Sequence, residues 1–313
     1  MYLSAEDARS DVILAGAAAV FGGTLLGLLL SAPGIPTTGV VAELIVVLAW
    51  FALSGLVPFL LARYREDVPG AFALGGGGGG RRGWSGAALL LAVPVAVLGA
   101  LRAVLIEGNL LTAVGGRIGR ALAASPVMGP ASVDVVGAVL AALQVIVLSV
   151  GSLLLLSFLT VRGAEAFRTD ERSATELLRT FGAGAIAVAA VAGLLTALTG
   201  ASSVAGVGLN LLGAVGLLAV ADRAVAHGST ITRPAVLTPL VVVVVAHLFA
   251  SGGIFRGGLL TGVYTGAMAG LTAVVLAVTI QQGRRAALTV PLLVAVHWWP
   301  SCLSPLPFSA AGC

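Results

Sequence analysis

Long apolar stretches alternate with short polar segments along the whole chain. Most of these stretches run for 17 residues or more, close to the ~20 residues with which a helix crosses a ~30 Å hydrocarbon core. They lack the strict alternation and the ~10-residue segments of a membrane β-barrel. The pattern therefore predicts an all-α, polytopic integral membrane protein. We place nine transmembrane helices near residues 12–31, 40–62, 84–106, 133–160, 181–199, 204–221, 235–251, 258–280 and 286–303.

The composition agrees with a lipid environment. Hydrophobic residues make up 58% of the chain, charged residues 10%, and the mean hydropathy is +1.09. A soluble domain carries about 25% charged residues to cover its surface. We expect a single membrane domain over residues 1–313, with segment 63–83 as a flexible Gly- and Arg-rich cytoplasmic loop. Residues 1–11 hold three carboxylates and one arginine, unlike the positive start of a secretory signal, so we expect the first helix to be retained.

The arginines predict the orientation. All 17 basic residues are arginine, which we interpret as the mark of a high-GC prokaryotic genome. With the N-terminus in the cytoplasm, 13 arginines fall in cytoplasmic segments and three in outer ones. This is the positive-inside bias of plasma-membrane proteins. We therefore predict nine crossings with the C-terminus outside, and no nucleic-acid partner, because no arginine run is interleaved with aromatics.

Two local patterns carry more specific predictions. Ser173 and Glu176 have the spacing of a capping box, which predicts that the fifth helix begins in the cytoplasm. Gly262, Gly266 and Gly270 recur every four residues on one face of the eighth span. Such stripes allow close helix packing, either within the chain, which we favour, or in a homo-oligomer.

Ionisable groups within spans are the candidate functional residues, because each costs roughly 2.5–3.5 kcal/mol at the centre of a membrane helix. The topology places Glu43, Arg102, His247 and His297 in the outer half of the membrane, with both histidines at similar depth. One hypothesis is a water-accessible cavity lined by these four residues. The alternative is structural: Glu43 pairs with Arg102, and each histidine bonds a neighbouring carbonyl.

Metal and cofactor binding have little support in the sequence. Zinc motifs on one helix place ligands about one turn apart, as in His-Glu-x-x-His, and the histidines here are far apart, with His227 in a loop on the other side of the membrane. We expect no metal and no cofactor. Cys302 and Cys313 both fall outside in this topology, where the environment is oxidising. They are expected to form a disulfide or to remain as two inert thiols.

The last third of the chain resembles the CAAX protease and bacteriocin-processing (CPBP) family of intramembrane proteases. The similar segments are Val-Val-Ala-His247-Leu-Phe and, 50 residues later, Val-Pro-Leu-Leu-Val-Ala-Val-His297. The resemblance implies a catalytic Glu-Glu-x-x-x-Arg motif on an earlier helix and an asparagine four residues after the second histidine. Ser301 occupies the asparagine position, and Glu165-Ala-Phe-Arg168 is the nearest match to the glutamate motif. A carboxylate that activates water is therefore missing, so the resemblance implies a degenerate relative.

Three classes of function follow, and each makes a different prediction. Transport predicts a wet cavity at Glu43, Arg102 and the histidines. A structural or accessory role beside another membrane protein predicts that these groups are paired within the chain. An enzyme requires a carboxylate within reach of His247 and His297. We expect transport or the accessory role rather than catalysis, with the lipid bilayer as the common partner.

Overall fold

Helices make up nearly all of the chain that the structure describes. The computed structural model describes residues 3–29, 40–74, 81–106, 130–167, 171–225, 228–250, 258–283, 286–298 and 301–307. The α-helices are α1 (Ala5–Ala17), α2 (Gly23–Leu29), α3 (Val40–Phe51), α4 (Val57–Tyr64), α5 (Val68–Ala71), α6 (Arg81–Leu105), α9 (Pro130–Ala166), α10 (Ala174–Leu198), α11 (Val204–Ala224), α12 (Arg233–Ala250), α13 (Leu259–Gly283) and α14 (Val290–Trp298). The prediction of an all-α protein is confirmed.

Short non-α segments complete the helices. The π-helical turns η1 (Ala18–Gly22) and η2 (Ala52–Leu56) join α1 to α2 and α3 to α4, and 3₁₀ turns η3 (Ala286–Thr289) and η4 (Ser301–Leu303) flank α14. The turn η2 directly precedes α4, in which Pro58 is the second residue. Proline cannot donate to the carbonyl four residues earlier and its ring crowds that carbonyl, so a locally wider turn relieves the conflict.

Within the part of the chain that the structure describes, six helical stretches are long and apolar enough to cross a membrane. They are Ala5–Leu26, Leu44–Tyr64, Val139–Ala166, Ala174–Leu198, Val204–Ala224 and Leu259–Gln282. Each overlaps one predicted span. The predicted spans 84–106 and 235–251 correspond to α6 and α12, of which the apolar parts Leu89–Leu105 and Arg233–Phe249 are shorter.

The ninth predicted span, 286–303, is not one continuous helix. Its α-helical part is α14, which has nine residues and is therefore about 14 Å long. Pro291 lies at the second position of α14 and cannot donate a backbone hydrogen bond to the preceding turn, while Pro300 disfavours helix at the residue before it. The two prolines thus confine α14 to a short segment between the 3₁₀ turns.

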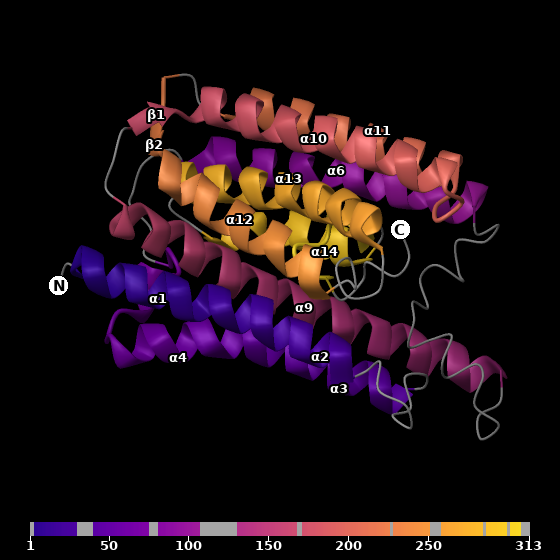
Figure 1. Cartoon of the computed structure of the whole chain (residues 1–313), viewed down its shortest axis with the longest axis horizontal. Helices are drawn as coiled ribbons and strands as arrows, with labels where there is room; N and C mark the ends of the chain where they lie inside the picture. Colours follow the sequence, from indigo (N-terminus) through magenta and orange to yellow (C-terminus); the bar gives the residue numbers. More distant parts are fainter. Residues whose placement is uncertain are drawn as a thin grey trace.

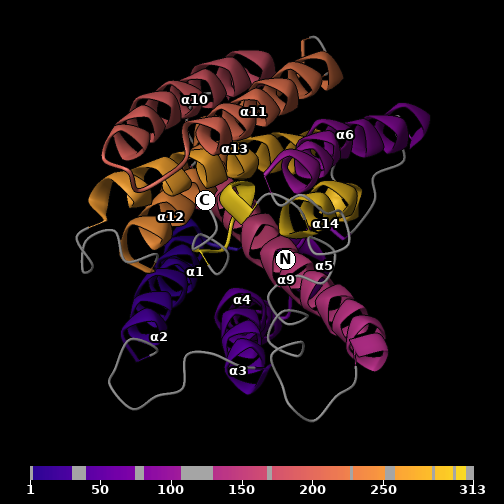
Figure 2. The same cartoon turned by 90° about the vertical axis from the view of Figure 1, so that its right-hand side faces the viewer.

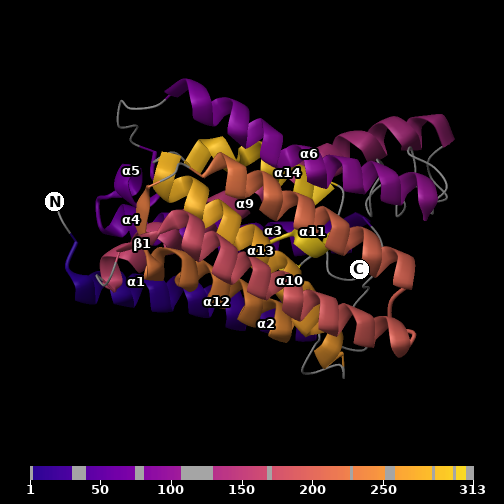
Figure 3. The ribbon, with the colours of Figure 1, turned by 90° about the horizontal axis from the view of Figure 1, so that it is seen from above.

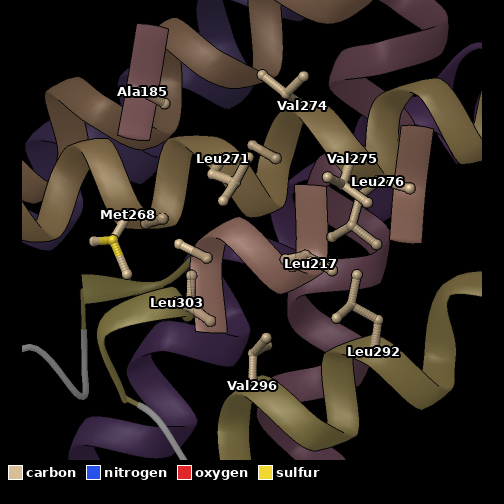
Figure 4. Packing of buried hydrophobic residues seen from close by; sticks show 14 of the residues in the cluster. Ala185, Leu217, Met268, Leu271, Val274, Val275, Leu276, Leu292, Val296 and Leu303 are labelled. Atoms are coloured by element: carbon tan, nitrogen blue, oxygen red, sulfur yellow. The ribbon is translucent and has the colours of Figure 1, made fainter. Parts of the chain in front are cut away.

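Helix α13 forms the centre of the bundle. Figures 1 and 2 show α10 and α11 side by side on one face of α13 and α9 with α1 to α4 on the opposite side, while α6, α12 and α14 lie at the level of α13. Within the apolar segment Leu259–Gln282 of α13, 94% of the most apolar stretch is buried inside the bundle. Figure 4 shows its side chains packed against residues of α10, α11, α14 and η4; the labelled residues are Ala185, Leu217, Met268, Leu271, Val274, Val275, Leu276, Leu292, Val296 and Leu303.

The glycine stripe of α13 packs inside the chain. A Cβ atom on Gly266 would lie 3.3 Å from the backbone oxygen of Val244 in α12, and one on Gly270 would lie 2.8 Å from Leu240. Glycine at both positions therefore permits α12 and α13 to approach closely. For Gly266 and Gly270, the favoured interpretation of the stripe as internal packing holds.

Two connections between helices pair as a small antiparallel sheet. Strand β1 (Glu171–Ser173) lies opposite β2 (Thr230–Thr232), with Arg172 opposite Ile231. Helix α10 begins directly after Ser173, the residue that the capping-box spacing indicates; its cytoplasmic position stays a prediction. The capping bond is not formed: Ser173 makes no side-chain cap hydrogen bond. Its backbone is instead extended in β1, and the amide of Ala174 donates to the carbonyl of Ser229.

Candidate functional site

Arg162 lies near the end of α9 and has no exposed surface. Its Nη1 is 2.7 Å from Oε2 of Glu165, one helical turn later, and its Nη2 is 3.1 Å from Oδ2 of Asp67, which precedes α5. Its Nε is 3.6 Å from Oδ2 of Asp11 in α1. The guanidinium also lies 5.7 Å from the ring centre of Phe158, within the range of a cation–π interaction. One arginine thus joins three parts of the fold.

Arg65 extends these contacts to the start of the chain. This residue follows α4, and its Nη1 is 2.8 Å from Oδ1 of Asp7 while its Nε is 3.3 Å from Oδ1 of Asp11. Burial would lower the pKa of Arg65, but the carboxylates of Asp11 and Asp7 hold it above the usual value for arginine. The six residues that these contacts join are called the Arg162 network: Asp7, Asp11, Arg65, Asp67, Arg162 and Glu165.

The Arg162 network contains four carboxylates and two guanidinium groups, so its formal charge is −2. Arg162 and Asp11 have side-chain exposures of 0% and 1%. Removing two such charges from water costs several kcal/mol each, and their attraction offsets that cost only when the geometry is good and further hydrogen bonds are made. Arg65 and Glu165 supply such bonds to the buried pair. The network therefore fixes how α1, α4, α5 and α9 meet.

The sequence pattern did not reveal this network. It placed Arg65 and Arg162 in cytoplasmic loops, whereas Arg162 lies inside α9, which continues to Ala166. The available signal was the i, i+3 spacing of Arg162 and Glu165 in a helix that has no other ionisable residue after Asp134. What the sequence could not supply is the partner Asp11, which is distant along the chain.

The two histidines selected from the sequence meet at Ser304. His297 in α14 uses both ring nitrogens: Nε2 lies 2.8 Å from Oγ of Ser152 in α9, and Nδ1 lies 3.1 Å from Oγ of Ser304. His247 in α12 is buried, with Nδ1 2.8 Å from the carbonyl oxygen of Val243, and it also bonds the backbone of Ser304. These residues are called the histidine cluster: Ser152, His247, His297 and Ser304.

A second polar group lies next to the histidine cluster. Asn210 in α11 is fully buried, and its Nδ2 donates to Oη of Tyr264 over 3.0 Å and to Sγ of Cys302 over 3.1 Å. Arg102 in α6 is close enough to Tyr264 to act on it electrostatically. Oδ1 of Asn210 is buried without a hydrogen-bond partner among the described residues. From this group the sequence pattern had indicated Arg102 for a polar cavity and Cys302 for a disulfide, but not Tyr264.

Two of the residues selected from the sequence are described only in part. Glu43 belongs to α3, but its side chain lies outside the described part of the structure, so its pairing with Arg102 stays a prediction. Cys302 is buried in η4, and Cys313 lies outside the described residues, so the disulfide also stays a prediction.

The chemistry available at these sites differs. Ser152 and His297 have the spacing of a hydroxyl and a base, but Ser152 has no exposed surface. Glu165, the nearest match to the CPBP glutamate motif, lies 13 residues beyond Ser152 on α9, or about 20 Å along the helix axis. Within the described residues, no three His, Cys, Asp or Glu side chains are arranged to hold a metal ion.

The fold and these sites define a class. The chain is an all-α protein, and its described residues include six helices of the length and composition of membrane spans, joined internally by buried polar contacts. Comparison with protein families, with curated proteins and with solved structures finds no match.

Proposed function

We propose that this chain is a multi-pass protein of a prokaryotic plasma membrane that acts as a structural or accessory partner of another membrane protein. The three classes of function differ in what they require of the intramembrane polar residues. Transport requires groups that face water, and hydrolysis requires a carboxylate beside the histidines. The accessory role requires groups that are paired within the chain.

The pairing of His297 carries the proposal. Both of its ring nitrogens lie within hydrogen-bond distance of serine hydroxyls, Ser152 on one side and Ser304 on the other. His247 likewise bonds the carbonyl of Val243, which is the structural alternative considered for a membrane histidine. A polar residue that is already satisfied by protein groups contributes to packing, and it has no free nitrogen to offer a substrate.

The proposed topology is nine crossings with the N-terminus in the cytoplasm. It is supported by the contacts at one end of the bundle, where Figures 1 and 3 place the N-terminus, β1 and the end of α4 together. The Arg162 network joins segments from the first two predicted cytoplasmic regions to the third, and the β1–β2 pairing joins the third to the fourth. These contacts agree with an even number of crossings between each of these four regions and the next, that is, with the first six predicted spans.

The alternative function is that of a degenerate CPBP relative. The approach of His247 and His297 to the same residue, Ser304, favours it. The position of Glu165 about 20 Å along α9 from Ser152 speaks against an active hydrolase, because that carboxylate lies too far away to activate water at His297.

Chemical modification of the histidines tests the proposal. The intact protein in membranes is treated with diethyl pyrocarbonate, and modification is mapped by mass spectrometry. We expect His227, which the sequence places in a loop, to react at least tenfold faster than His247 and His297. A wet, transport-type cavity predicts similar rates for all three residues, and that result would overturn the proposal.

Isolation under mild conditions supplies the second test. The chain is purified from its native membrane in a gentle detergent, and the stoichiometry of associated proteins is measured by native mass spectrometry. The accessory role predicts a defined complex with a second membrane protein. Uptake of a solute by liposomes that contain this chain alone would assign the function to transport instead.

A further inference from the structure

A groove of about 610 Å³ opens beside the Arg162 network, at the end of the bundle that holds β1 and β2. This volume lies within the 300–1,000 Å³ range of small-molecule sites. The lining residues come from five elements and the turn after α5: Pro69, Gly70, Ala73, Val161, Ala164, Glu165, Glu171, Thr230, Ile231, Thr232, Ile280 and Gln281.

The charged side chains that line the groove are acidic. Among the described residues its lining includes Glu165 and Glu171 and no basic side chain, although Arg162 lies behind Glu165. Two helices also end there, since Glu165 is in the last turn of α9 and Gln281 in the last turn of α13. The C-terminus of a helix carries a partial negative charge of about −0.5. Carboxylates and helix dipoles therefore both favour a cation in this groove.

The groove also has an unused hydrogen-bonding group and an apolar wall. The Oγ1 atom of Thr232 is buried and has no hydrogen-bond partner among the described residues. A buried hydroxyl without a partner is unfavourable, and a bound hydrogen-bond donor would satisfy it. Val161, Ile231 and Ile280 supply apolar surface beside it.

We propose that this groove binds a primary alkylammonium group. The ammonium lies between the carboxylates of Glu165 and Glu171, with Thr232 as a further acceptor, and the alkyl part lies along Ile231 and Ile280. Glu165 already neutralises Arg162 through Oε2, so Glu171 supplies the principal charge. The same chemistry is offered by the headgroup of an aminophospholipid and by a soluble amine.

Binding of hexylammonium to the purified full-length chain tests this site. Binding in a neutral detergent is followed by thermal unfolding, with hexan-1-ol as the uncharged comparison. We expect saturable stabilisation by hexylammonium and none by hexanol. Glu171→Gln keeps the bond that Glu171 accepts from Thr230 but removes the charge, and it is expected to weaken binding roughly tenfold or more. Glu176→Gln, an exposed carboxylate outside the groove, is the matched control.

A second variant and a lipid arm complete the test. Thr232→Val removes the unpaired hydroxyl at nearly constant volume, and it is expected to weaken hexylammonium binding several-fold while the protein still elutes as the folded species. Hexylammonium binding is then measured in nanodiscs of phosphatidylcholine with and without phosphatidylethanolamine. If phosphatidylethanolamine competes with hexylammonium, the natural ligand is the lipid headgroup. If it does not compete, the natural ligand is a soluble amine. Equal binding of hexanol and hexylammonium, or unchanged binding by Glu171→Gln, would refute the proposal.

Discussion

Arg162 illustrates how a charged residue is retained inside an apolar helix bundle. Its guanidinium lies within 4 Å of three carboxylates on three elements, although only the contact with Glu165 is also a well-aligned hydrogen bond. Nε and Nη2 are buried without such a bond in the described structure. The pair of Arg162 and Asp11 thus depends on charge more than on hydrogen-bond geometry. Loss of Arg162 leaves the buried carboxylate of Asp11 with Arg65 as its remaining cationic neighbour, so part of its desolvation cost is no longer offset.

Arg162→Met is therefore expected to destabilise the protein by about 3–5 kcal/mol. Buried Asp11 would keep only Arg65 as a cationic neighbour, and Asp67 and Glu165 would lose their contacts with the guanidinium. Thermal unfolding in detergent measures the loss. Addition of Asp11→Asn to this variant removes the stranded charge and is expected to restore at least half of the stability. If the double variant were less stable than Arg162→Met alone, the pairing of these two residues would not be the cause.

Arg179→Met provides the matched control. Arg179 bonds Asp222 through Nε at 2.6 Å, but its side chain is 65% exposed. Exposed ion pairs contribute about 0–1 kcal/mol, so this variant should unfold close to the wild-type temperature.

Ser152→Ala is expected to cost about 1–3 kcal/mol, because Nε2 of His297 loses its hydrogen-bond partner in a buried site. Ser157→Ala is the control on the same helix: Ser157 is equally buried, but its hydroxyl bonds the carbonyl of Leu153 in its own helix, a type of bond that contributes little to helix stability. Chemical denaturation of both variants checks the difference. Equal loss of stability in the two variants would show that the hydrogen bond of Ser152 to His297 contributes no more than the bond of Ser157 within its own helix.

Among the elements, α9 and α12 show how close helix packing depends on single glycines. A Cβ atom on Gly163 would lie 2.6 Å from Oγ1 of Thr238 and 3.0 Å from the backbone oxygen of Pro234. The hydroxyl of Thr238 can rotate away, but its Cβ atom, 2.9 Å from the added atom, and the backbone of α12 at Pro234 must shift.

Gly163→Ala should therefore destabilise the protein by about 1–3 kcal/mol, the usual cost of overpacking. A Cβ atom on Gly184 in α10 would meet no other atom within 4 Å, so Gly184→Ala should be neutral or stabilising by up to about 1 kcal/mol. Parallel thermal unfolding of the two variants measures the contrast. Similar stabilities would mean that α9 and α12 adjust freely at this contact.

The extent to which the elements could be predicted follows the range of the interactions. Apolar length and helix start signals are local, so the helices and the residue before α10 were found from sequence. The sequence also contains Pro291 and Pro300, but the apolar residues between them indicated one continuous span over 286–303, so the short length of α14 was not predicted. The contacts of Asp11 with Arg162 and of Ser152 with His297 join residues more than 140 positions apart, and no periodicity along the chain records such pairs.

For the molecule as a whole, the proposed topology predicts where the two ends of the chain lie. In intact spheroplasts, an N-terminal epitope tag should be protected from an impermeant protease and a C-terminal tag should be cleaved. The reason is that 13 of the 17 arginines then remain on the cytoplasmic side. A protected C-terminal tag would mean that α14 and its flanking turns do not complete a crossing, and would reduce the count to eight.

The Arg162 network also constrains the order of events during synthesis. Asp11 precedes Arg162 by 151 positions, so at about 5–20 residues per second the ribosome delivers the arginine roughly 8–30 s after the aspartate. During that interval the first helix enters the bilayer with Arg65 as the only cation of the network that can reach it. The first helix therefore reaches its final position only after α9 has emerged from the insertion machinery.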